Sequence, residues 1–249
     1  MIDILFLHFF IGHILADYYL QTATMAKEKE KAFRYLLSHC LIYLLTMMLV
    51  ILPLFNWQLL LWALFIGFVH FIIDACKVLI SKRFEFNDLQ NVLLYLIDQF
   101  VHILTILFVV TFILFVQVDI SYFSFLDEVL NHFDFDVKEI LSWIVMLLLI
   151  LQPSSITIRK VLDHFDPKTS DEGITNAGAL IGVFERLLIL FMLYANQYAA
   201  IGFVLTAKSI ARYNKIAEDP KFAEYYLLGT LLSSLLVIAS FTISFLRSI

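Results

Sequence analysis

The chain has 249 residues, of which 61% are hydrophobic and only 16% are charged, with a formal net charge of -5. A soluble domain averages roughly 45 to 50% apolar and about 25% charged residues, so this composition excludes an ordinary soluble protein. Lys and Arg form no basic stripe of their own, so we expect no nucleic acid as a partner.

Eight apolar segments of roughly bilayer-spanning length predict an all-α polytopic transmembrane helix bundle. In chain order they cover residues 2–22, 34–53, 57–80, 89–117, 139–160, 174–195, 197–213 and 224–246. The sixth and seventh are joined at Asn196 and Gln197 with almost no loop, so seven spans are the alternative to eight. The first segment has no basic stretch before it and no cleavage site after it, and we interpret it as a retained membrane helix.

The positions of Lys and Arg predict the orientation of the bundle. If the first segment runs from outside to inside, most of the 17 basic residues fall on one side, and the acidic stretch 119–136 falls on the other. Cytoplasmic loops retain positive charge, so both termini are predicted to lie outside. We divide the chain into an N-terminal four-helix unit, residues 1–118, and a C-terminal set of membrane helices, residues 119–249.

Three of the first four segments carry a His and an Asp four positions apart, which places both side chains on one helical face. The pairs are His13 with Asp17, His70 with Asp74, and Asp98 with His102, and the second segment adds His39. Ionisable groups inside a bilayer cost several kcal/mol and therefore mark functional sites. All seven lie between the midplane and the predicted cytoplasmic end, so we expect them around one cavity that opens inward.

Imidazole nitrogen together with carboxylate oxygen suits Zn²⁺, Mn²⁺ or Fe²⁺ better than Mg²⁺ or Ca²⁺. We interpret six residues as ligands of one divalent metal, Zn²⁺ first, or of two metals bridged by a carboxylate: His13, Asp17, His70, Asp74, Asp98 and His102. His39 is interpreted as a ligand or general base, and Asp98 also as a catalytic group. The set predicts a metal-dependent hydrolase of a membrane-associated or phosphorylated substrate.

Three other interpretations of the same residues remain open. Each His and Asp pair can be a buried hydrogen-bonded couple that fixes helix packing. Alternatively, the residues can form a relay in an ion- or proton-coupled transporter or channel. The protein can also be a membrane anchor or sensor that recruits a cytosolic partner through its basic loops.

A second polar group follows in the C-terminal half, where Glu185 and Arg186 lie inside the sixth segment. Adjacent residues on a helix do not face each other, so we expect Lys208 or Arg212 as the partner of Glu185, and Glu224 or a phosphate for Arg186. We interpret Glu185, Arg186, Lys208 and Arg212 as a pocket for a phosphate or an anionic lipid head group, which makes membrane lipids expected partners. The alternative is ordinary anchoring by cytoplasmic basic residues with an aromatic belt.

The N-terminal motifs resemble one known family. They are His13-x3-Asp17-Tyr-Tyr-Leu-Gln21, Met25-Ala26-Lys27, His39, His70-x3-Asp74-x2-Lys77 and Asp98-Gln99-x2-His102. This pattern is similar to the bacterial membrane proteins grouped as domain of unknown function 3307, over the N-terminal part of the chain to just past His102. The resemblance implies a multi-pass protein of the bacterial cytoplasmic (inner) membrane and assigns no activity.

The C-terminal polar group is similar to the corresponding half of longer members of this family. Some longer members are encoded beside a small cytosolic protein, SatD, so the resemblance implies a SatD-like protein as a partner. Whether the chain forms a homo-oligomer stays open.

Overall fold

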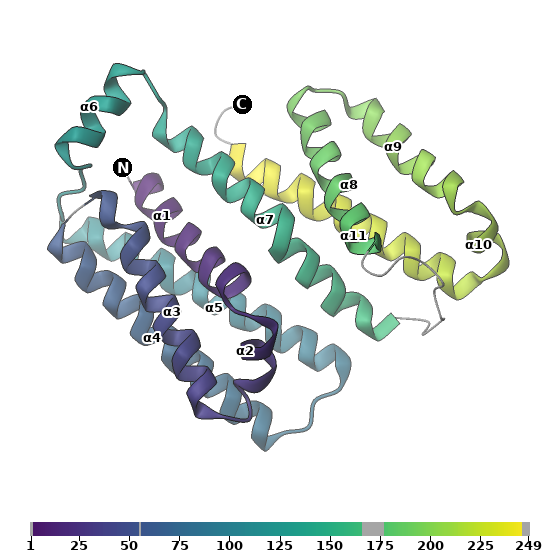
Figure 1. The fold of residues 1–249 in the computed structure, drawn as a ribbon, viewed down its shortest axis with the longest axis horizontal. Helices are drawn as coiled ribbons and strands as arrows, with labels where there is room; N and C mark the ends of the chain where they lie inside the picture. The colour runs from purple at the N-terminus through teal and green to yellow at the C-terminus, as the bar shows by residue number, and fades with distance from the viewer. Residues whose placement is uncertain (1, 55, 166–176, 246–249) are drawn as a thin grey trace. The chain divides into compact units, whose positions relative to one another are not determined.

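The computed structural model describes residues 2–54, 56–165 and 177–245 (Figure 1). These residues form helices and connecting segments, and none of them lies in a strand, which confirms the predicted all-α class. The chain divides into two compact units, Met1–Val145 and Met146–Ile249. This division lies inside a helix, later in the chain than the boundary after residue 118 that we expected from the sequence.

Six helical segments are long and apolar enough to cross a membrane, as expected of a membrane protein. They are α1 (Ile2–Ile14) continued by the π-helix η1 (Leu15–Leu20), α3 (Phe33–Val50) continued by η2 (Leu52–Leu54), α4 (Trp57–Arg83), α5 (Asp88–Phe115), α7 (Val137–Leu162) and α11 (Pro220–Phe245).

The two other expected spans correspond to α8 (Ala177–Tyr194) and α9 (Tyr198–Ala211). Residues 174–176 of the expected sixth span lie outside the described residues. Helix α9 has only 14 residues, fewer than the roughly 20 that a perpendicular crossing needs. The count of eight spans and the outside location of both termini therefore stay predictions.

Unit 1 is a bundle in which α3 packs against α1 and α4, and α5 packs against the same two helices. Two glycines allow the close approach of α3. A Cβ at Gly12 of α1 would come within 2.9 Å of the Met47 Sδ, and one at Gly67 of α4 would come within 2.6 Å of the Leu44 Cδ1. The absence of a side chain at both positions therefore brings three helices close together.

Two of the long helices of unit 1, α4 and α5, begin at side-chain caps. Asn87 and Gln90 form a capping box at the start of α5, in which each side chain accepts a hydrogen bond from the other residue's backbone N–H, at 2.9 and 3.0 Å. Asn56 caps α4 by accepting from the Gln58 N–H at 2.9 Å. Because the caps fix where these helices start, they also fix the height at which the polar residues of α4 and α5 stand.

The interior of unit 1 has an apolar half and a polar half. The apolar half, near the N-terminus of α1, contains side chains from all four long helices, including Leu5, Phe9, Met47, Leu59, Ile106 and Ile113. The polar half lies toward the short helix α2 (Ala23–Glu28) and contains the predicted His and Asp residues. The functional residues therefore gather at the end of the bundle that also carries basic loop residues.

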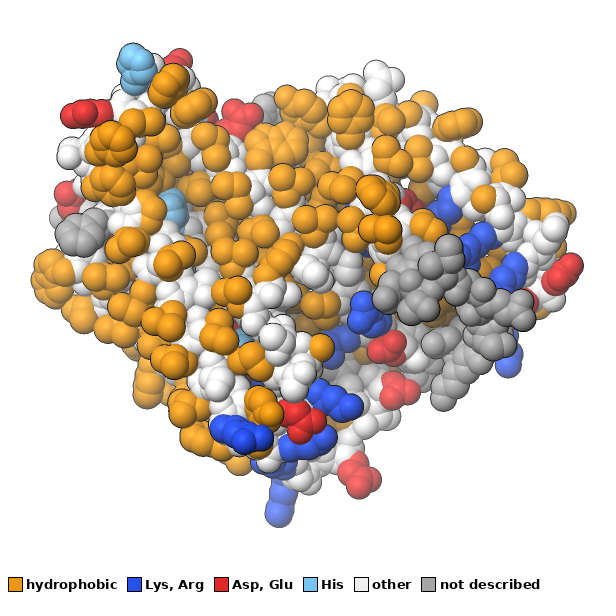
Figure 2. Space-filling model, in the orientation of Figure 1, with side chains coloured by type: hydrophobic (Ala, Val, Ile, Leu, Met, Phe, Trp, Pro, Cys, Tyr) orange, Lys and Arg blue, Asp and Glu red, His pale blue; other side chains and the backbone are white. Residues whose placement is uncertain are grey.

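The outer surface of unit 1 suits a lipid environment. Large apolar side chains on the outer faces of the helices are exposed, among them Leu49, Phe68 and Phe108. Figure 2 shows hydrophobic side chains over most of the visible face of α3 and α4, with Lys and Arg side chains toward the end near α2. Helix α6 (Ser124–His132) follows α5 and carries the exposed Phe125.

Unit 2 contains most of α7, the short η3 (Asp163–Phe165), α8, α9, α10 (Tyr213–Glu218) and α11. Helix α8 packs against both α9 and α11. Pro153 lies inside α7 and removes one backbone donor, so the Leu149 carbonyl accepts from the Ser154 hydroxyl instead, at 2.8 Å.

Candidate metal centre

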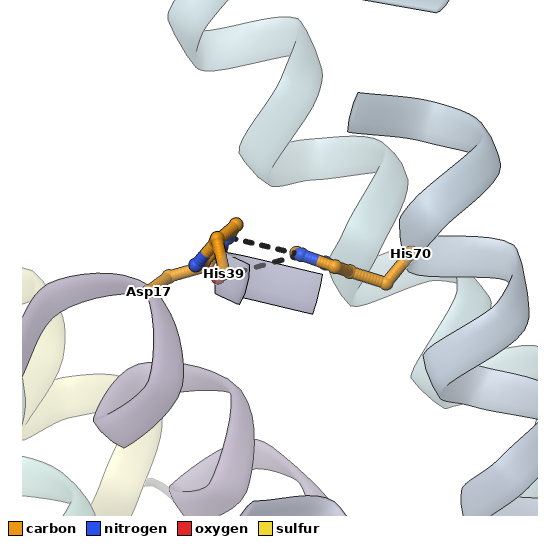
Figure 3. Close-up of side chains that lie close together, drawn as sticks. All are labelled: Asp17, His39 and His70. Atoms are coloured by element: carbon orange, nitrogen blue, oxygen red, sulfur yellow. Dashed lines mark hydrogen bonds and ion pairs between the residues drawn. The ribbon is translucent and has the colours of Figure 1, made fainter. Parts of the chain in front are cut away.

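Three ligand atoms from three helical segments converge in the polar half of unit 1 (Figure 3). The His39 Nε2 of α3 lies 3.1 Å from the His70 Nε2 of α4. The Asp17 Oδ1 of η1 lies 3.4 Å from the first of these nitrogens and 3.8 Å from the second. Asp17 is carried by a π-helical turn, an irregularity that is frequent at functional sites.

The spacing of these three atoms matches the edges of a metal coordination shell. Zn²⁺ holds nitrogen and oxygen ligands at about 2.0–2.2 Å in a tetrahedron, which separates neighbouring ligand atoms by about 3.3–3.6 Å. The observed 3.1, 3.4 and 3.8 Å surround that range. The two carboxylate contacts are longer than ordinary hydrogen bonds, which suits a cation between the groups better than direct hydrogen bonding.

Asp74 lies at the side of this group. Its Oδ2 lies 3.4 Å from the His39 Nε2 and 3.9 Å from the His70 Nε2, and it also forms an ion pair with the Lys29 Nζ at 2.8 Å. Cys40, which we did not predict as a ligand, offers a thiol within 4.8 Å of ligand atoms of His70 and Asp74.

Asp98 and His102 form a second buried pair on α5. The Asp98 Oδ1 lies 3.5 Å from the His102 Nε2, while the Asp98 Oδ2 binds the Lys77 Nζ at 2.6 Å. The His102 ring stacks on the His70 ring with a centroid distance of 4.4 Å. Because of this contact, the pair is adjacent to the three converging ligands.

His13 supports Asp17 from the opposite side. Its Nδ1 lies 3.6 Å from the Asp17 Oδ2, the carboxylate oxygen that is not directed at His39 and His70. The same nitrogen lies 3.4 Å from the Tyr43 hydroxyl. The ligand role that we predicted for His13 stays a prediction, and its contacts place it next to the three converging atoms.

Sequence reasoning assigned no role to Gln99 or Tyr18. The Gln99 amide donates to the Asp17 Oδ2 at 3.5 Å and to the Asp98 Oδ2 at 3.2 Å, and the Tyr18 hydroxyl donates to the Gln99 Oε1 at 2.8 Å. This network joins η1 to α5 and holds two carboxylates together. Gln99 falls inside the quoted family motif, which was the available signal.

The sequence profile of a family described as proteins of unknown function, DUF3307, matches residues 5–130. The chain belongs to the DUF3307 family. The matched segment includes all seven predicted His and Asp residues and Gln99, and it ends before unit 2. No curated protein and no solved structure matches the chain significantly. The family assignment therefore covers the candidate metal centre and names no activity.

The charges of this DUF3307 centre are almost balanced. The Lys29 side chain, which follows α2 outside the spans, is only 12% exposed, and this partial burial lowers its pKa. The attraction of Asp74, with smaller contributions from Asp17 and Asp98, raises the pKa by more than burial lowers it. The Lys29 side chain therefore stays protonated. With Lys77 also paired, two ammonium groups face three carboxylates. One negative charge is left over if the imidazoles are neutral, and among the described residues Asp17 forms ion pairs only with histidines.

The C-terminal polar group splits into two separate contacts in unit 2. Lys208 binds Glu185 and the Thr230 hydroxyl, which confirms one of the two expected partners of Glu185. The Arg186 guanidinium does not pair with Glu224 as one expectation had it. It donates to two backbone carbonyls of α7 and to the Ser155 hydroxyl.

Arg186 therefore bonds α8 to α7 next to the helix irregularity at Pro153. The remaining predicted member, Arg212, lies over the Phe222 ring at 5.8 Å. The pocket for a phosphate or lipid head group stays a prediction.

Proposed function

We propose that this protein is a metal-dependent membrane hydrolase whose metal, Zn²⁺ or alternatively Mn²⁺ or Fe²⁺, is held by Asp17, His39 and His70. The observation that carries the proposal is the convergence of three buried ligand atoms from three segments, at separations expected around a metal ion. A buried carboxylate without a lysine partner supports the need for a cation at this point.

A metal ion in such a site activates water and polarises a phosphoryl or carbonyl oxygen. The chain itself supplies a proton acceptor in the Asp98 and His102 pair, which stacks beside His70 and whose facing atoms have no hydrogen-bond partner. We assign this pair the general acid and base role: it takes a proton from the attacking water and returns one to the leaving oxygen. His39, predicted as ligand or base, is assigned as a ligand.

The charge of the centre favours an anionic substrate. With all imidazoles neutral, the metal-free group carries one surplus negative charge, and a divalent cation turns this into one surplus positive charge. Net charge inside a bilayer is costly, so a phosphorylated substrate is stabilised there and a neutral ester gains nothing comparable. The Lys29 and Lys77 side chains, 12% and 20% exposed, stand at the edge of the centre where such a substrate would enter.

The relay interpretation requires a polar path to both faces of the membrane. Beyond the centre, the described core of unit 1 is apolar, with Leu5, Phe9, Ile106 and Ile113 all at 0% exposure. The polar residue His8 in that half donates its Nδ1–H to the Ile4 carbonyl at 2.8 Å. A centre backed by an apolar core on one side fits a hydrolase better than a transporter.

The test is metal content and hydrolysis measured on the same preparations. Wild type, Asp17→Asn and His70→Ala are purified in detergent, stripped with chelator, reloaded with Zn²⁺ and analysed by inductively coupled plasma mass spectrometry. Chromogenic phosphomonoester, phosphodiester and carboxyl ester substrates are then compared. We expect wild type to retain metal and to hydrolyse a phosphoester, and both variants to lose the two properties.

His8→Ala is the matched control, since His8 is buried in the same helix but contacts the Ile4 carbonyl and the Tyr122 ring, neither of which belongs to the centre. It should keep metal and activity. A wild type that binds no metal after reloading, or an Asp17→Asn variant with full metal and activity, would overturn the proposal. The predicted partners, membrane lipids and a SatD-like cytosolic protein, are not needed for this outcome.

A further inference from the structure

Asp74, Asp98 and His102 form a second group of potential ligands beside the first one. Each offers an atom within 4.8 Å of the other two, and all three side chains are buried. This group shares no residue with Asp17, His39 and His70, but Asp74 also lies 3.4 Å from the His39 Nε2. The two groups are therefore adjacent, with Asp74 between them.

Two atoms of this second group have no hydrogen-bond partner although they are buried. They are the Asp98 Oδ1 and the His102 Nε2, which lie 3.5 Å apart. Their 3.5 Å separation is long for a direct hydrogen bond, and a cation shared by both atoms would satisfy both. The separation also agrees with neighbouring ligands of a Zn²⁺ or Mn²⁺ ion.

We infer that a second divalent cation binds between Asp74, Asp98 and His102, so that the centre is binuclear and Asp74 bridges the two ions. This inference rests on the metal site of the proposed function, and it replaces the acid and base role assigned there to Asp98 and His102, whose facing atoms now serve as ligands. Lys77 does not block the second ion, since it binds the Asp98 Oδ2, whereas the Oδ1 faces the His102 Nε2. Lys29 and Lys77 balance Asp74 and Asp98 when metal is absent.

The second ion narrows the substrate class. Two divalent cations turn the single surplus negative charge of the centre into three surplus positive charges. A phosphomonoester dianion and one hydroxide together cancel this charge, whereas a phosphodiester leaves part of it unbalanced inside the membrane. Two ions about 3.5–4 Å apart also stabilise both the attacking and the leaving oxygen of a phosphoryl group. The geometry therefore favours a phosphomonoester.

The experiment is a titration of chelator-stripped protein with Mn²⁺, read by electron paramagnetic resonance and by bound metal after dialysis. Wild type, His102→Gln and Asp98→Asn are compared with His39→Gln and the control His8→Ala. Circular dichroism and size exclusion establish that each variant is folded. We expect two Mn²⁺ per chain and the spectrum of an exchange-coupled pair in wild type and in the control.

His102→Gln and Asp98→Asn should bind one Mn²⁺ with the spectrum of an isolated ion. The second site would be overturned if wild type binds one isolated Mn²⁺, His102→Gln binds the same ion, and His39→Gln loses it. That result would leave the proposed function intact. No bound Mn²⁺ or Zn²⁺ in wild type would overturn both. A coupled pair that persists in both α5 variants would show that the second ion lies elsewhere, and would also overturn the inference.

Discussion

The ion pair between Lys29 and Asp74 should be the strongest single electrostatic contact between the α2 region and α4. Its Nζ to Oδ2 distance is 2.8 Å, and the two side chains are only 12% and 2% exposed. At an effective dielectric constant of about 20, the Coulomb attraction at this distance is about 6 kcal/mol, before the cost of removing both charges from water. Removing one partner of a buried pair typically costs about 3–5 kcal/mol, since the other charge stays behind unpaired.

Lys29→Met should therefore lower the free energy of unfolding of the metal-free protein by about 3–5 kcal/mol. Lys31→Met is the matched control, since the Lys31 Nζ binds Glu28 at a similar 3.0 Å but its side chain is 64% exposed. Exposed pairs contribute about 0–1 kcal/mol. Equilibrium unfolding in mixed detergent micelles measures both variants, and Asp74→Asn in the Lys29→Met background should restore part of the loss.

Alkaline titration gives an independent reading of the same contact. Because the pKa of Lys29 is raised in the folded state, its stabilising contribution is complete below the ordinary lysine pKa and is lost as pH rises through the raised value. Wild type should lose this stability at high pH, and Lys29→Met should not. Equal losses for Lys29→Met and Lys31→Met, or no recovery in the double variant, would refute the reasoning from burial.

Three further predictions concern other parts of the chain. Gly67→Ala should lower the free energy of unfolding by about 1–3 kcal/mol, since its Cβ would come within 2.6 Å of the Leu44 Cδ1. Gly202 has open space around it, so Gly202→Ala should leave the free energy of unfolding unchanged or raise it in the same assay. Arg186→Met should lower the free energy of unfolding by about 2–4 kcal/mol, because the hydrogen bonds to the α7 carbonyls are lost. Arg212→Met removes a cation–π contact and should lower it by about 0.5–1 kcal/mol. Equal losses in the two variants would count against the assigned contacts. Saturating Zn²⁺ should raise the thermal midpoint of wild type and leave that of Asp17→Asn unchanged, as followed by tryptophan fluorescence, and a shift in both would place the metal elsewhere.

The residues that form the centre could be predicted from the sequence because of two strong physical constraints. Apolar blocks of bilayer length determine helices, and ionisable residues inside such blocks are too costly to be kept without a partner. The spacing of four between His70 and Asp74 fixes their common face through helix geometry alone, and the structure brings their atoms to within 3.9 Å. Membership of the DUF3307 family was also evident from these motifs.

The lysine partners were not predictable at the same level. Lys29 belongs to a basic loop, and a lysine in such a loop is usually interpreted as an exposed charge that orients the chain in the membrane. Only the return of the chain after α2 brings its Nζ to Asp74. Gln99 similarly meets Asp17 across more than eighty residues, a contact that depends on the packing of α1 against α5.

The sequence by itself determined that this protein is a helical membrane protein with three His and Asp pairs at one depth. The rotation of each helix about its axis, and therefore whether the pairs meet, was decided only by the tertiary structure. Side chains at Gly12 and Gly67 would separate α3 from its neighbours, and the π turn at Asp17 changes the face that this residue presents. Such packing depends on the shapes of several helices together, so it cannot be predicted from any one segment of the sequence.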